Sequence, residues 1–194
     1  MTREEYLRAM ATELNTRVFT PACYPLQMDK IAISCGFPSR KATASRNRTI
    51  GQCFSDVING KNEIFIHPQL ATVTNVGETL AHELVHAYDN CVNGHRAPFR
   101  RIAVAIGLTG KMTSTVAGEG LQTTLDEIRE VIGDYPHEAL NYTPKKKQST
   151  RLIKAVCYSH DYIVRMSRKT IAEHGAPICP TCFFNGSPEI LDIE

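Results

Sequence analysis

The sequence TLAHELVHAYDNCVNGH occupies residues 79–95 and contains the pattern H-E-x-x-H at His82, Glu83 and His86. It belongs to a longer stretch, residues 73–91, in which apolar residues recur at steps of three and four. This periodicity predicts a helix with one face in the core, ending near Asn93-Gly94. The stretch therefore places the two histidines and the glutamate on one amphipathic helix.

The spacing of the two histidines indicates a metal site. Residues four apart on a helix lie one above the other, so the imidazoles of His82 and His86 can converge on a single zinc ion. Glu83 projects beside them, within reach of a metal-bound water, and is the candidate catalytic base. A catalytic zinc site keeps three protein ligands and one open position, so a third ligand is needed.

Two residues could supply this third ligand. His95 follows Gly94, where the helix is expected to end and the chain can reverse over the metal face, and we favour it for that reason. Glu119, which stands between two glycines further along the chain, is the alternative.

A second cluster of potential ligands lies near the end of the sequence. Cys157-x-x-His160 and Cys179-x-x-Cys182 have the spacing of the two knuckles of a zinc ribbon. Four ligands of this kind predict a closed, structural zinc site in a lobe too small to bury a sufficient apolar core by itself. His174 is a rival for the position of His160.

The remaining pattern predicts an α+β domain followed by a linker and the ribbon. We expect a peptidase-like domain over residues 1–142, a basic linker over 143–150 and a zinc-ribbon domain over 151–194. In the first domain, a small antiparallel sheet is expected to pack beside the helix with the H-E-x-x-H pattern. The predicted strands are 31–35, 50–54 and 63–66, and the further predicted helices are 4–18, 98–106 and 121–132.

At these residues the chain resembles the SprT-like zinc metallopeptidases, the group that includes the Spartan-type DNA–protein crosslink proteases. The matching segments are Thr79–Tyr88, Gly94-His95, Pro98-Phe99 and the predicted strand and turn over residues 64–70. In the ribbon, His160 stands where members of this group usually have a cysteine.

The resemblance implies a fold and an activity. The fold would be zincin-like, with His82, His86 and His95 as ligands of a catalytic zinc and Glu83 as the base. Cys157, His160, Cys179 and Cys182 would hold a structural zinc. The implied activity is endopeptidase cleavage of DNA-associated or DNA-crosslinked proteins in DNA repair, with the ribbon binding DNA.

Charge and composition set the expected partners and location. Between Lys145 and Lys169 there are eight Lys or Arg residues and one acidic residue, with Tyr158 and Tyr162 among them, as in surfaces that bind nucleic acid without reading its sequence, including single strands. The seven cysteines are an odd number at irregular spacing, which is a poor disulfide framework and indicates an intracellular, cytoplasmic protein. We expect no signal peptide, no membrane span and a monomer.

Two other functions fit the same residues. The chain could be a DNA- or RNA-binding zinc module without proteolytic activity, which would require a fourth protein ligand, such as Asp89 or Glu119, on the first zinc. It could also be a peptidase for an unrelated protein substrate, with the ribbon making protein contacts.

Overall fold

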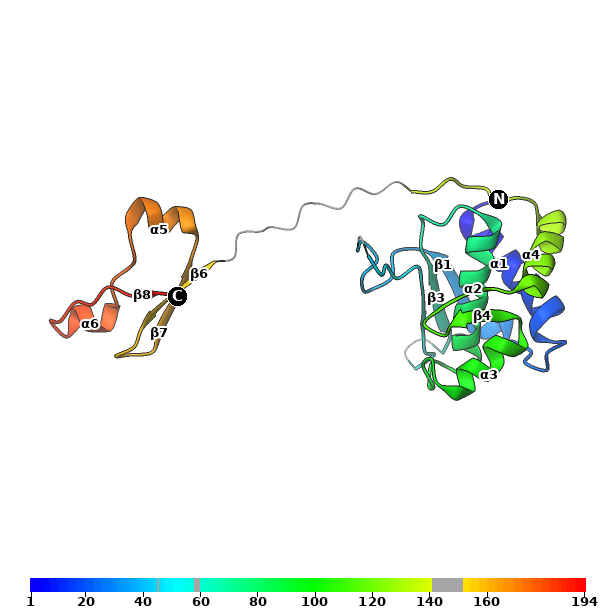
Figure 1. Ribbon diagram of the computed structural model, residues 1–194, viewed down its shortest axis with the longest axis horizontal. Helices are drawn as coiled ribbons and strands as arrows, with labels where there is room; N and C mark the ends of the chain where they lie inside the picture. The colour runs from blue at the N-terminus through cyan, green and yellow to red at the C-terminus, as the bar shows by residue number, and fades with distance from the viewer. Residues whose placement is uncertain (45, 58–59, 141–151) are drawn as a thin grey trace. The chain divides into compact units, whose positions relative to one another are not determined.

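The structure is a computed structural model that describes residues 1–44, 46–57, 60–140 and 152–194. The chain divides into two compact units, Met1–Pro144 (unit 1) and Lys145–Glu194 (unit 2), and each mixes helices with small sheets (Figure 1). The expected linker, residues 143–150, lies outside the described residues. No helix in the described part of the chain is both long and apolar enough to cross a membrane.

Unit 1 contains four α-helices and five strands in its described residues. In chain order they are α1 (Arg3–Leu14), β1 (Ile31–Cys35), β2 (Gly51–Phe54), β3 (Asn62–Ile66), α2 (Val73–Tyr88), α3 (Ala97–Ala105), β4 (Leu108–Lys111), β5 (Ser114–Ala117) and α4 (Glu119–Ile132). A π-helical turn, Asn15–Phe19, extends α1, and a 3-10 turn, Met28–Lys30, precedes β1.

The first sheet has the strand order β1-β3-β2, with β1 parallel to β3 and β2 antiparallel to β3. The expectation of an antiparallel sheet is therefore wrong for one of its two pairs. The last strand in sequence lies between the other two, and the long connection over residues 36–50 allows β2 to return on the far side of β3 in the opposite direction. Alternation of apolar residues predicts which face of β3 is buried but carries no information about strand direction.

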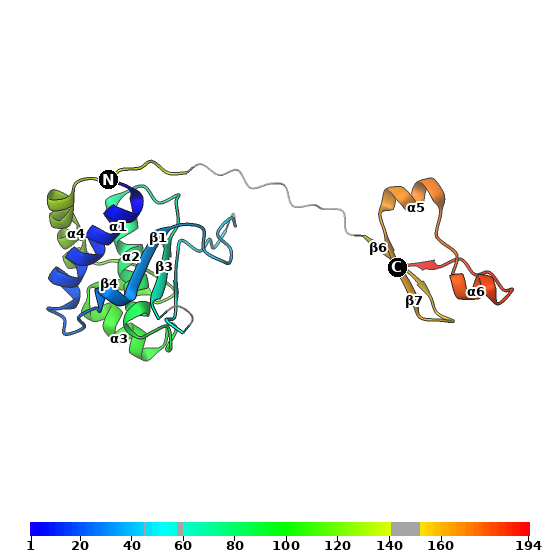
Figure 2. The same ribbon diagram turned by 180° about the vertical axis from the view of Figure 1, so that it is seen from behind.

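Helix α2 lies in the middle of unit 1, in contact with the sheet, α1 and α4 (Figure 1). Thr72 begins the helix, because its hydroxyl accepts the N–H of Asn75 at 3.2 Å. Its apolar face is buried throughout, as the periodicity predicts, and Leu80 and Leu84 are fully inaccessible. Helix α1 contacts both α2 and β1, and lies beside β1 (Figure 2).

Helix α2 ends earlier than the apolar pattern predicts. Asn90 and Cys91 adopt left-handed backbone conformations, with φ of 53° and 59°. The Asn90 side chain accepts from the Asn62 amide at 2.9 Å and donates to the Asp56 carboxylate at 2.7 Å. These contacts with the β2–β3 connection and β3 hold Asn90 outside the helix, so the chain turns several residues before Gly94.

Strands β4 and β5 form an antiparallel hairpin that has no counterpart among the predicted strands. Each strand has four residues and most of them are exposed, so the strands lack the run of alternating buried apolar residues by which a strand is predicted. The hairpin lies against α2 and leads directly into α4.

The described residues of unit 2, 152–194, form a three-stranded antiparallel sheet in the order β7-β6-β8 and two short helices. The elements are β6 (Ile153–Cys157), β7 (Tyr162–Met166), α5 (Arg168–His174), α6 (Pro180–Phe184) and β8 (Asp192–Ile193). Its buried hydrophobic cluster has five members, three of which are cysteines: Ala155, Cys157, Cys179, Cys182 and Leu191. So small an apolar core fits a lobe held together by a metal.

Candidate metal centres

Three imidazoles converge at one point of unit 1. His82 and His86 extend from α2, and His95 follows Gly94, whose left-handed φ of 52° reverses the chain. The Nε2 atom of His95 lies 3.1 Å from Nε2 of His82 and 3.2 Å from Nε2 of His86. The structure therefore brings together the three histidines that the sequence analysis selected, in a group that could hold a metal ion.

The spacing of these nitrogen atoms fits a zinc site. Two nitrogens bound at the usual distances to a tetrahedral zinc ion lie about 3.3 to 3.4 Å apart. The distances of 3.1 and 3.2 Å are close to this value. Three lone pairs that face one another are unfavourable unless a cation or a shared proton lies between them, so the arrangement itself favours a bound cation.

The protonation of the three histidines agrees with ligand roles. Burial lowers the pKa of His82 to about 3, with a further contribution from its two neighbours, and lowers the pKa of His86 to about 4. Burial also lowers the pKa of His95. All three rings are therefore neutral at pH 7, which is the form that binds a metal.

Glu83 follows His82 in α2, and its side chain is enclosed between α2 and β2. It is 6% exposed, and burial raises the pKa of its carboxyl group to about 8, against the effect of a hydrogen bond from the backbone N–H of Cys53. The carboxylate approaches the backbone of β2 so closely that a Cβ atom at Gly51 would stand 2.5 Å from Glu83 Oε1. The absence of a side chain at Gly51 is therefore a condition for this position of Glu83.

Two residues outside the motif hold the imidazoles in place. The buried ring of Phe99 lies under all three, with ring centroids 4.9 Å from His82, 4.4 Å from His86 and 5.0 Å from His95. Thr115, on β5, has its hydroxyl oxygen 2.8 Å from Nδ1 of His82. In the sequence, Phe99 is marked only by the SprT-like resemblance, and nothing in the sequence pattern marks Thr115.

The alternative ligands lie apart from the three histidines. Among the described residues, the group includes neither Glu119, which is exposed at the start of α4, nor Asp89, whose carboxylate oxygens are buried without a hydrogen-bond partner. The ring of Tyr88 packs edge-on against Tyr24, with centroids 5.4 Å apart.

The four predicted ribbon ligands meet in unit 2. Nδ1 of His160 lies 3.2 Å from Sγ of Cys182, 3.8 Å from Sγ of Cys157 and 4.0 Å from Sγ of Cys179. The sulfur atoms of Cys157 and Cys182 are 3.6 Å apart. Ligands of a tetrahedral zinc with sulfur and nitrogen donors lie about 3.5 to 3.8 Å from one another, so this group could hold a metal ion, consistent with zinc.

His160, rather than His174, joins the three cysteines. His174 ends α5 with its side chain 72% exposed, and it lies 4.0 Å from the carboxylate of Glu173. A residue that the sequence analysis missed, Glu189, adjoins the cluster: its carboxylate lies 3.4 Å from Sγ of Cys182 and accepts the Ser159 hydroxyl at 3.0 Å.

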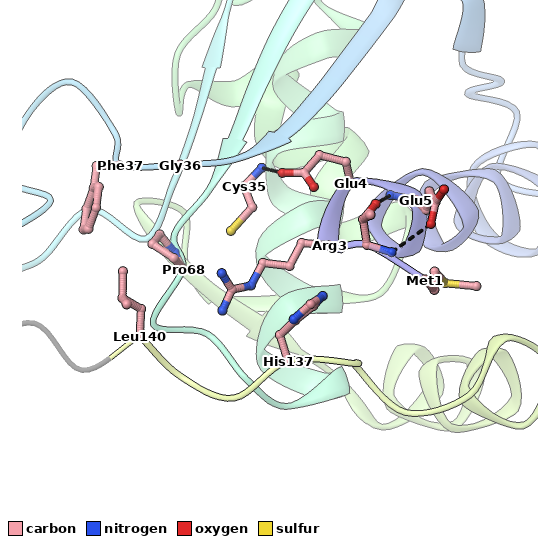
Figure 3. Close-up of a pocket in the computed structure, with 11 residues that line it drawn as sticks. Met1, Arg3, Glu4, Glu5, Cys35, Gly36, Phe37, Pro68, His137 and Leu140 are labelled. Atoms are coloured by element: carbon pink, nitrogen blue, oxygen red, sulfur yellow. Dashed lines mark hydrogen bonds between the residues drawn. The ribbon is translucent and has the colours of Figure 1, made fainter.

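A separate cavity of about 610 Å³ lies at the N-terminal end of α1 (Figure 3). Glu4 accepts the N–H of Cys35 at 3.2 Å, and Glu5 accepts the N–H of Thr2 at 2.8 Å, so both carboxylates already have partners. None of the described residues that line this cavity belongs to either metal-ligand group.

No family model matches the chain, and neither does any curated protein or solved structure. The SprT-like resemblance therefore remains an expectation based on the motif residues.

Proposed function

We propose that the chain is a zinc-dependent endopeptidase of the SprT-like type, with a zincin-like peptidase domain in unit 1 and a zinc ribbon in unit 2. The observation that carries the proposal is the convergence of three neutral imidazoles, with Nε2 of His95 3.1 and 3.2 Å from those of the other two, on the helix that also carries the buried carboxylate of Glu83. Three ligands rather than four, among the described residues, favour a catalytic over a structural site.

In this proposal His82, His86 and His95 hold the catalytic zinc, and Cys157, His160, Cys179 and Cys182 hold the structural one. When bound, the catalytic zinc supplies Lewis acidity, which polarises a scissile carbonyl and makes water acidic enough to lose a proton near neutral pH. Glu83 takes that proton on its carboxylate and later gives it to the leaving amine. Glu83 must be ionised to accept the proton, and the charge of a zinc ion held by the neutral imidazoles would favour that form.

We further propose that the substrates are proteins associated with or crosslinked to DNA, and that unit 2 binds the DNA without sequence preference. Exposed aromatic and basic side chains on unit 2 support this: Tyr158 is 67% exposed, Tyr162 is 40% exposed, and Arg165, Arg168 and Lys169 are exposed as well. Aromatic faces stack on bases and cations neutralise phosphates, a combination suited to single strands. Lys145, Lys146, Lys147 and Arg151 lie outside the described residues.

The test compares the wild-type chain with Glu83→Gln, using zinc content and cleavage of histones with and without single-stranded DNA. We expect two zinc ions per chain in both proteins, and DNA-stimulated cleavage only in the wild type, because the substitution removes the base and keeps the ligands. Glu119→Gln is the matched control and should retain both zinc and cleavage. Loss of zinc in Glu83→Gln would show that the roles are wrongly assigned.

The competing functions predict other results. Two zinc ions with no cleavage under any DNA condition would favour a binding module without proteolytic activity. Cleavage that is indifferent to DNA, together with no salt-dependent binding of DNA, would favour a peptidase for an unrelated protein.

A further inference from the structure

The hairpin β4–β5 is attached to α2 at two points that match in register. The N–H of Ala117 donates to the carboxylate of Glu78 at 3.0 Å, and the hydroxyl of Thr115 lies 2.8 Å from Nδ1 of His82. Four residues along a helix advance about 6 Å, and two residues along a strand advance about 6.6 Å. Glu78 and His82 therefore present their side chains at nearly the same interval as Ala117 and Thr115, and β5 runs along α2 in the opposite direction.

This placement gives the two nitrogens of His82 different partners. Nε2 faces the other imidazoles, 3.1 Å from Nε2 of His95, whereas Nδ1 faces the Thr115 hydroxyl. A neutral imidazole carries a proton on only one nitrogen, and the hydrogen bond at one nitrogen determines which form is present.

We propose that Thr115 is a positioning residue, which accepts a hydrogen bond from Nδ1–H of His82 and so leaves the Nε2 lone pair directed at the metal position. The inference rests on the proposed function only in taking His82 as a metal ligand, and it holds whether or not the bound metal cleaves peptides. The hydrogen bond fixes both the tautomer and the orientation of the ring before the metal arrives. Partners of this kind typically change metal affinity by about 10- to 100-fold.

The experiment uses the full chain with Thr115→Val and Thr115→Ser. Valine keeps the shape and the β-branched side chain but removes the hydroxyl, whereas serine keeps the hydroxyl. Thr109→Val is the matched control, since Thr109 lies on β4 of the same hairpin and its hydroxyl reaches only the carbonyl oxygen of Val116, at 3.4 Å. Cobalt affinity is measured by absorption, and the thiolate-to-cobalt band of the ribbon site serves as the internal reference.

We expect Thr115→Val to weaken cobalt binding at the histidine site by about 10- to 100-fold, with Thr115→Ser and Thr109→Val close to the wild type. Nitrogen-15 NMR of the metal-free chain should show His82 protonated at Nδ1 in the wild type and in Thr115→Ser, and a mixture of tautomers in Thr115→Val. Unchanged affinity in Thr115→Val, equal weakening in Thr115→Ser, or a wild-type His82 protonated at Nε2 would each overturn the inference. Cobalt binding without peptide cleavage would reject the proposed activity and leave the role of Thr115 intact.

Discussion

Gly51 offers a direct test of how unit 1 positions its carboxylate. A Cβ atom at this residue would stand 2.5 Å from Oε1 and 2.9 Å from Cγ of Glu83, and 2.7 Å from Cγ2 of Thr79. Ordinary van der Waals contact between such atoms begins at about 3.5 Å. Since β2 is held by its pairing with β3, Gly51→Ala should displace the Glu83 side chain by about 1 Å.

Two consequences of this displacement can be given magnitudes. Crowding at a buried position costs about 1 to 3 kcal/mol in free energy of unfolding, and the reduced entropy of the unfolded alanine chain offsets up to about 1 kcal/mol of it. A shift of 1 Å in a catalytic group lowers the rate by about 100-fold. Zinc content should stay at two per chain, because none of the three atoms nearest to a Cβ at Gly51 belongs to a histidine.

The assays are urea denaturation, zinc content and histone cleavage, with Gly120→Ala as control. Gly120 lies in α4 with nothing within 4 Å of its added Cβ, so this variant should be as active as the wild type and slightly more stable. A Gly51→Ala chain with wild-type stability and wild-type cleavage would refute the claim that the close approach of β2 positions Glu83.

Three further changes test other parts of the structure. Phe99→Ala should lower the free energy of unfolding by about 3 to 5 kcal/mol, as expected for a fully buried ring, and weaken cobalt binding at the histidines; an unaltered cobalt spectrum would contradict the supporting role of the ring. Burial raises the pKa of Tyr6 to about 12 from 10.0, so its stabilising contribution is complete below pH 10 and is lost as the pH rises to 12. We expect an alkaline decrease of about 1 to 2 kcal/mol in the free energy of unfolding measured by urea denaturation. The decrease should be smaller in Tyr6→Phe, in which Tyr135, whose pKa burial also raises to about 12, still titrates. His160→Cys should keep the metal of unit 2 and His160→Ala should release it, as followed by the cobalt–thiolate band, whereas metal loss in His174→Ala would show that the fourth ligand is wrongly identified.

Most elements of unit 1 could be predicted because their apolar periodicity is strong. Strand β1 matches its predicted range, and α3 and α4 begin one or two residues from theirs. The helix with the H-E-x-x-H motif was found for the same reason, since its buried face repeats at helical spacing over its whole length. The geometry of a helix alone then brings its two histidines, four residues apart, onto one face.

What the sequence could not supply depends on contacts between distant residues. The early end of α2 comes from the hydrogen bonds of Asn90 with Asp56 and Asn62, which lie 34 and 28 residues away. The partner of His82 lies 33 residues away on a hairpin too short and polar to be recognised. Side chains that support a site from another element leave no periodic signal in their own segment.

The ligands of each metal group also lie close together along the chain. His82 and His95 are separated by 13 positions, and Cys157 and Cys182 by 25. Loop closure becomes only slowly more costly with length, and the difference between these two loops is about 0.6 kcal/mol. An unfolded chain can therefore still gather several ligands around a metal ion, so each ion should stabilise the native fold by less than its affinity for the folded protein implies.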